Sequence, residues 1–130
     1  MQPTNPPRLA LVDDDDLSMT RVFNRCLSMW GWEAVECHSI AAALAAFPQG
    51  PFALAVCDVD LPDGDGISLA QVLVKRNPSL SVLIVSGLPD NLDRARRGGL
   101  AACLRKPLEL PELKALIDSP RSGKESLDLA

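Results

Sequence analysis

Five polar residues stand directly after apolar segments of this sequence, where the strands of a parallel sheet would end. They are Asp13, Asp14, Asp58, Ser86 and Lys106. Ligands of an open parallel sheet collect outside the carboxyl ends of its strands, at the point where the winding reverses. We therefore expect these side chains to meet in one site. Such residue types suit phosphoryl transfer, in which a carboxylate is the nucleophile, a lysine neutralises charge and a hydroxyl binds a phosphoryl oxygen.

The three carboxylates of this set predict a bound cation. Carboxylates brought close together repel one another by several kcal/mol per pair at an effective dielectric of about 20. Mg²⁺ fits such a site because it prefers hard oxygen ligands and binds through one or two carboxylates plus phosphate oxygens. The next two residues of the acidic run, Asp15 and Asp16, are interpreted as solvated turn residues or helix caps.

The elements that must position these residues alternate between apolar and helical segments, which is the pattern of a doubly wound α/β fold with parallel strands. The segment before Asp58 is apolar at every position, as expected of a central strand covered on both faces. Strands are predicted at Leu9–Val12, Trp32–Cys37, Phe52–Cys57, Leu80–Val85 and Leu100–Leu104. If their order is 2-1-3-4-5, the three aspartates meet at the reversal point, with Ser86 and Lys106 beside them.

The helices between these strands are predicted from apolar residues at helical spacing and from capping residues. They span Leu17–Trp30, the alanine-rich stretch up to Phe47 that Ser39 can cap, Ile67–Arg76, Asp90–Arg97 and Leu110–Ile117. The stretch Leu61–Gly66 is predicted to be a turn-rich loop. Residues 1–7 are predicted to be a flexible tail, and residues 119–130 a tail or the start of a linker. One domain is therefore expected over residues 8–118.

Composition excludes several other classes of protein. The chain has 130 residues, of which 47% are hydrophobic and 23% charged, as in one globular domain. A net charge of −4 with scattered basic residues argues against nucleic-acid binding. No apolar run approaches the roughly 18 residues of a membrane helix, and no signal peptide is recognisable. A cytoplasmic location without membrane association is predicted.

The cysteines predict no metal or redox site. They stand at positions 26, 37, 57 and 103 without a C-x-x-C pair, and the one histidine is His38. These spacings argue against zinc and thioredoxin-type sites. Cys57 and Cys103 lie in apolar runs and are interpreted as small buried hydrophobic residues.

Four segments, taken in order, resemble the receiver domain of two-component response regulators. They are the acidic pair in Leu-Val-Asp13-Asp14, the stretch from Asp58 through Pro62-Asp-Gly-Asp-Gly66, the turn Val-Ser86-Gly, and Leu-Arg-Lys106-Pro107. The resemblance covers residues 8–118 and implies a flavodoxin-like five-stranded sheet of order 2-1-3-4-5.

The resemblance also implies the role of each site residue. Asp58 would accept a phosphoryl group from a kinase phosphohistidine, and Ser86 and Lys106 would bind the phosphoryl oxygens. Asp13 and Asp14 would hold Mg²⁺ with Asp58, and the main-chain carbonyl of Asp60 would be a further ligand. The Lys106–Pro107 peptide would be cis. Such a domain is a signalling protein that catalyses its own phosphorylation and dephosphorylation.

Partners follow from the same resemblance. A sensor histidine kinase or a histidine phosphotransfer protein would supply the phosphoryl group, and an output domain or a downstream protein would sense it. The face of the fourth helix, fifth strand and fifth helix could form a homodimer. Three departures from the family pattern bear on this face and its switch: Gly87 replaces the usual Ala, Cys103 replaces the usual aromatic residue, and the last helix is short.

Two other functions share part of this residue pattern. A haloacid-dehalogenase-type phosphatase also uses an aspartate, a second aspartate two residues later, a lysine and Mg²⁺, as Asp58 and Asp60 superficially suggest. Those enzymes place the nucleophile on the first strand, whereas here the acidic pair comes first. A pseudo-receiver that binds partners without phosphorylation usually lacks one of the site residues, and this chain has all of them.

Overall fold

The computed structural model describes residues 8–118, so the predicted tails at 1–7 and 119–130 lie outside the described residues. Five parallel strands form one sheet in the order β2-β1-β3-β6-β7. Their bounds are β1 Arg8–Asp13, β2 Trp32–Cys37, β3 Leu54–Asp58, β6 Ser81–Ser86 and β7 Cys103–Arg105. Counted among themselves along the chain, these strands have the order 2-1-3-4-5, which confirms the predicted doubly wound fold.

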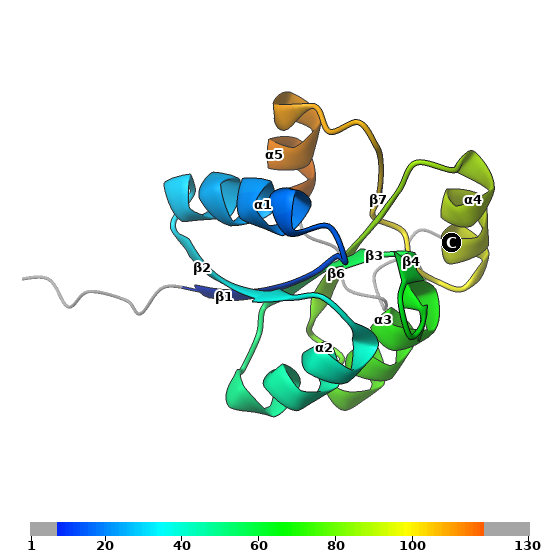
Figure 1. The fold of residues 1–130 in the computed structure, drawn as a ribbon, viewed down its shortest axis with the longest axis horizontal. Coiled ribbons are helices and arrows are strands. Elements are labelled where there is room, and N and C mark those ends of the chain that lie inside the picture. The colour runs from blue at the N-terminus through cyan, green and yellow to red at the C-terminus, as the bar shows by residue number, and fades with distance from the viewer. Residues whose placement is uncertain (1–7, 119–130) are drawn as a thin grey trace, which may run out of the picture.

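Helices cover both faces of the sheet, as Figure 1 shows. Helices α1 and α5 lie on one face, and α2, α3 and α4 pack on the other. Their bounds are α1 Leu17–Met29, α2 Ile40–Ala46 with a 3₁₀ turn Phe47–Gln49, α3 Gly66–Arg76, α4 Pro89–Arg97 and α5 Leu110–Asp118. None of these helices is long and apolar enough to cross a membrane.

The core consists of two apolar layers, one on each side of the sheet. Because side chains of a strand alternate between the two faces, neighbouring residues of β1 belong to different layers. Leu11 packs in the layer under α2 and α3, whereas Val12 packs in the layer under α1. Every residue of β3 is buried, as predicted for the central strand. The free thiols of Cys26, Cys37 and Cys57 are also buried, and Cys103 is half-buried.

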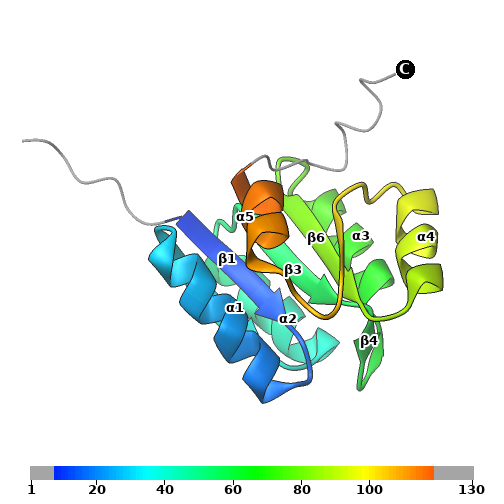
Figure 2. The same ribbon diagram turned by 90° about the horizontal axis from the view of Figure 1, so that it is seen from above.

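Three segments differ in detail from their predicted structure. The stretch predicted as a loop contains a two-stranded antiparallel hairpin, with β4 at Asp60–Leu61 and β5 at Gly64–Asp65. Figure 2 shows this hairpin extending beyond the carboxyl end of β3. The last strand is shorter and later than the predicted Leu100–Leu104, because only Cys103–Arg105 reaches the edge of β6. The central strand begins at Leu54 and not at Phe52.

Candidate functional site

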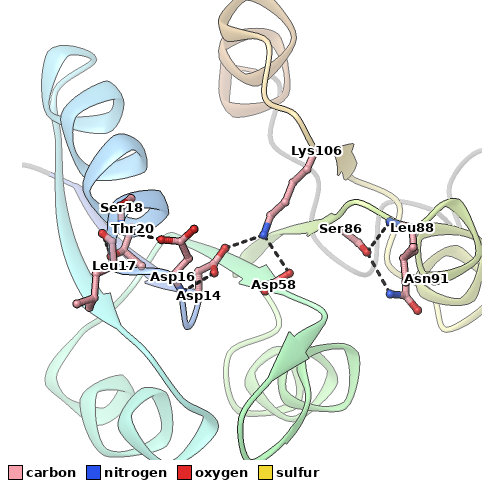
Figure 3. A network of polar contacts seen from close by, with 10 residues as sticks. All are labelled: Asp14, Asp16, Leu17, Ser18, Thr20, Asp58, Ser86, Leu88, Asn91 and Lys106. Atoms are coloured by element: carbon pink, nitrogen blue, oxygen red, sulfur yellow. Dashed lines mark hydrogen bonds and ion pairs between the residues drawn. The ribbon is translucent and has the colours of Figure 1, made fainter.

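The carboxyl ends of β1 and β3 and the residue after β7 bring three charged side chains together (Figure 3). The ammonium nitrogen Nζ of Lys106 lies 3.1 Å from Oδ2 of Asp14 and 3.5 Å from Oδ1 of Asp58. Asp14 and Asp58 are buried, and the Lys106 side chain is only 25% exposed. The Lys106–Pro107 peptide is cis, as expected. The structure therefore places three of the predicted site residues in direct contact.

Asp58 is a carboxylate with an unusual affinity for protons. Burial and, next, the negative charge of Asp14 raise its pKa to about 6, although Lys106 opposes both effects. Lys106 offsets only part of the shift because its ammonium lies closer to Asp14 than to Asp58. Burial lowers the pKa of Lys106, but its hydrogen bond to Asp14 and the charge of Asp58 outweigh burial and raise that pKa overall.

A carboxylate cluster at this edge could hold a metal ion. Oxygen atoms of Asp14, Asp15 and Asp58 lie within 4.8 Å of one another. Such a set of hard oxygen donors fits Mg²⁺, which binds through carboxylates and keeps several waters. Asp15 is exposed, and one of its oxygens lies in this cluster, although the sequence favours a turn or cap role for this residue. The sequence alone could not predict that Asp15 lies in the cluster, because the point where β1 ends decides which of the four aspartates reach it.

Asp13 is not part of that cluster. Strand alternation places it on the face of Leu11, in register between Cys37 and Cys57. Its side chain is buried, and neither carboxylate oxygen has a hydrogen-bond partner within the described residues. Burial raises the pKa of Asp13 to about 7, and the charge of Asp63 is the next largest cause. The oxygens of Asp13 thus lie outside the carboxylate cluster, although the charges of Asp14 and Asp58 also raise its pKa. Its predicted role as a metal ligand stays a prediction.

Asp16 begins α1. Its carboxylate accepts a hydrogen bond from the Ser18 amide at 2.9 Å, which confirms the predicted helix cap. The Asp16 amide in turn donates to Oδ1 of Asp14 at 2.9 Å. This bond leaves Oδ2 of Asp14 for Lys106, as Figure 3 shows. The start of α1 thus fixes the orientation of a carboxylate in the cluster.

Ser86 ends β6 on the other side of Asp58. Its hydroxyl oxygen accepts hydrogen bonds from the Leu88 amide and from Nδ2 of Asn91, each at 3.1 Å. Figure 3 shows the hydroxyl directed toward these two residues and away from Asp58. The structure thus brings Ser86 beside the site, but its hydroxyl is bonded to the start of α4.

Comparison with known proteins decides the family. The sequence model of the response regulator receiver domain matches residues 9–118. This chain belongs to that family. It is 29% identical over 120 residues to the transcriptional regulatory protein ZraR of Escherichia coli (strain K12), an alignment that covers 91% of this chain and 27% of ZraR. This chain thus spans about a quarter of the length of ZraR.

Shorter relatives match the receiver over most of their length. The response regulator receiver protein CpdR of Brucella abortus (strain 2308) is 29% identical over 109 residues, which cover 79% of this chain and 88% of CpdR. The crystal structure of a CheY-like response regulator receiver domain protein from Methanospirillum hungatei JF-1 has a TM-score of 0.80 at 25% identity. That match covers 88% of this chain and 93% of the other chain.

The hairpin that follows Asp58 links the receiver site to two helices. At its tip, the carboxylate of Asp63 accepts hydrogen bonds from the amides of Ile40 and Ala41 at 2.8 and 3.0 Å, at the start of α2. At its end, Asp65 forms an ion pair of 2.8 Å with Arg94 of α4. Neither contact was predicted from the sequence, because each joins segments more than twenty residues apart.

Gly66 holds the hairpin against the end of β3. Its amide donates to the carbonyl of Val59 at 2.7 Å, and a Cβ atom at this position would collide with the main-chain carbonyl of Asp58. Only glycine permits so close an approach of two backbones. Asp60, which follows Asp58 by two residues, is exposed at the start of the hairpin. Its predicted role as a main-chain metal ligand stays a prediction.

Proposed function

We propose that this receiver accepts a phosphoryl group on Asp58, in an Mg²⁺-dependent reaction, from the phosphohistidine of a sensor histidine kinase or a histidine phosphotransfer protein. The observation that carries the proposal is the position of the Lys106 ammonium between the carboxylates of Asp14 and Asp58. A carboxylate nucleophile next to a fixed positive charge has what phosphoryl transfer chiefly needs, which is positioning and charge neutralisation.

In the proposed step, a carboxylate oxygen of Asp58 attacks phosphorus and forms a P–O bond while the P–N bond of the phosphohistidine breaks. The electron pair of that bond returns to the imidazole nitrogen of the donor. Lys106 stabilises negative charge on the phosphoryl oxygens, and the Ser86 hydroxyl donates a hydrogen bond to one of them after it turns toward Asp58. The nucleophile must be ionised, and the positive charge of Lys106, which lowers the pKa of Asp58, favours that form.

The carboxylate cluster is the proposed metal site. Mg²⁺ bound there would supply positive charge to the transferred phosphoryl group. We assign the side-chain ligands to Asp14, Asp15 and Asp58, whose oxygens lie together, and retain the Asp60 carbonyl as a further ligand. Asp13 would then act on the site through its charge, because its oxygens are not in the cluster.

Labelling with acetyl phosphate, followed by intact-protein mass measurement, tests this function. With Mg²⁺ we expect one stable phosphoryl group per chain, and with EDTA none. Asp58→Asn should abolish labelling. Asp93→Asn is the matched control, because Asp93 is an exposed aspartate of α4 whose ion pair with Arg96 lies outside the site. Full labelling of Asp58→Asn would refute the assignment of the acceptor.

The same experiment separates the alternative functions. Continuous release of phosphate without a stable label would favour the haloacid-dehalogenase-type phosphatase. No label and no turnover, with Mg²⁺ present, would favour a pseudo-receiver that signals without phosphorylation.

The partners form part of the proposal. An output domain or a downstream protein would sense the phosphorylated state, and the face formed by α4, β7 and α5 could pair two copies. The last turn of α4 is basic and the first turn of α5 contains Glu112, so this face has charges of both signs that a two-fold arrangement can bring together. The cytoplasmic location predicted from the sequence belongs to the same proposal.

A further inference from the structure

The Ser86 hydroxyl has a polar environment on the side away from the acceptor. Its oxygen is buried and accepts from the Leu88 amide and from the Asn91 side chain, each at 3.1 Å. A hydroxyl oxygen has two lone pairs, so these two donors satisfy it as an acceptor. Asn91 belongs to the first turn of α4 and is five residues from Ser86 in the chain. The start of α4 therefore holds the hydroxyl in one orientation (Figure 3).

Asn91 is itself held by a second contact. Arg94, one turn later on α4, approaches Oδ1 of Asn91 with Nη2 at 3.5 Å. The same guanidinium donates through Nη1 to Oδ2 of Asp65 at 2.8 Å. Asp65 is anchored in turn, because it caps α3 by accepting from the Ile67 amide at 3.1 Å. A continuous chain of polar contacts thus runs from Ser86 to the hairpin that follows the acceptor.

A phosphoryl group on Asp58 would compete with Asn91 for Ser86. The hydroxyl is directed away from Asp58, so donation to a phosphoryl oxygen requires rotation about its side-chain torsion into another staggered well. That rotation breaks the bond from Asn91 and removes the acceptor of the Leu88 amide. A contact made only before phosphorylation shifts the population toward the resting state.

We propose that Asn91 is a positioning residue of the phosphorylation site, which holds the Ser86 hydroxyl in its resting orientation, and that Arg94, anchored on Asp65, holds Asn91 in place. This inference rests on the proposed role of Asp58 as acceptor. Removal of Asn91 should therefore favour the phosphorylated conformation, because Ser86 then turns toward Asp58 without losing a hydrogen bond to Asn91.

Binding of beryllofluoride, a phosphoryl mimic, measures this preference. By isothermal titration calorimetry with Mg²⁺, we expect Asn91→Ala to bind about three- to tenfold more tightly than the unsubstituted protein, the factor that corresponds to one hydrogen bond. Asp93→Ala is the matched control on the same helix, since its partner Arg96 forms no hydrogen bond or ion pair with Ser86 or Asn91 in the described residues. It should leave the affinity unchanged.

A double-mutant cycle separates positioning from a general effect on α4. In a Ser86→Ala background, Asn91→Ala should no longer tighten binding, because the group through which it acts is gone. Amide exchange of the ligand-free protein gives a second readout: the Leu88 amide should exchange faster in Asn91→Ala.

The outcomes are distinct. Tighter binding that disappears in the Ser86→Ala background, with faster exchange at Leu88, supports the inference. Unchanged affinity of Asn91→Ala, or equal tightening in both backgrounds, overturns it and leaves the proposed function intact. Failure of the unsubstituted protein to bind beryllofluoride would overturn the proposed function, and this inference with it.

Discussion

Replacement of Asp13 by asparagine should stabilise the protein, relative to the unsubstituted chain, by more at high pH than at low pH. The substitution removes a buried carboxylate that has no hydrogen-bond partner in the described part of the chain. Burial raises the pKa of Asp13 from 3.8 to about 7. The folded protein therefore binds a proton at this site more strongly than the unfolded chain does. Stability is consequently lost as the pH rises from about 4 to 7.

The pKa shift sets the size of the effect. A shift from 3.8 to about 7 corresponds to about 4 kcal/mol of unfavourable free energy for the ionised form, at about 1.4 kcal/mol per pH unit. By linkage, about 4 kcal/mol of this penalty is present at pH 8 and about 2 kcal/mol at pH 5. The buried amide of asparagine also lacks partners, at a cost of about 1–3 kcal/mol that does not depend on pH. The stability gain from Asp13→Asn should therefore be about 2–3 kcal/mol larger at pH 8 than at pH 5.

Urea unfolding in EDTA at pH 5, 6, 7 and 8 measures this difference. The free energy of unfolding is extrapolated to water at each pH for the unsubstituted protein and for Asp13→Asn. Asp93→Asn, at an exposed position, is the control and should show no comparable trend. A gain for Asp13→Asn that is the same at every pH would show that the carboxylate of Asp13 ionises as easily when folded as when unfolded, and would refute the reasoning.

The same variant tests the metal assignment. Because the oxygens of Asp13 are not in the carboxylate cluster and Asp13 would act on it only through its charge, Mg²⁺ should still stabilise Asp13→Asn. Loss of that stabilisation would restore Asp13 to the metal site predicted from the sequence.

Three further predictions concern the surroundings of the acceptor. Gly66→Ala should lower the free energy of unfolding by more than about 2 kcal/mol, as measured by urea unfolding. Gly87→Ala is the comparison and should change that free energy by less than about 0.5 kcal/mol, because its Cβ would meet only the Lys106 side chain at 4.0 Å. Millimolar Mg²⁺ should raise the Tm relative to EDTA, and by less in Asp15→Asn; equal Tm values with and without Mg²⁺ would contradict a metal site. Alanine at both Asp60 and Leu88 should alter the dephosphorylation rate, since an acid can orient water and an apolar side chain can exclude it; an unchanged rate would contradict this role.

Much of the fold follows from local properties of the sequence. Apolar segments with strand periodicity alternate with helical segments, and that alternation predicted the five strands and the layers that cover them. The position of Asp58, the proposed acceptor, was predictable for the same reason, because it is the carboxylate at the end of the buried central strand. Helix caps such as Asp16 and Ser39 were also predictable, since capping depends on residues only two or three positions apart.

The tertiary structure alone decided the details of the site. Four consecutive aspartates are chemically identical in the sequence, but the end of β1 buries Asp13 beside Cys57, while oxygens of Asp14 and Asp15 lie in the cluster. The contacts from Asn91 to Ser86 and from Arg94 to Asp65 depend on how α4 packs beside the hairpin. Strand register and helix packing arise from burial summed over the whole core, so residue types and local spacing do not specify which polar groups finally meet.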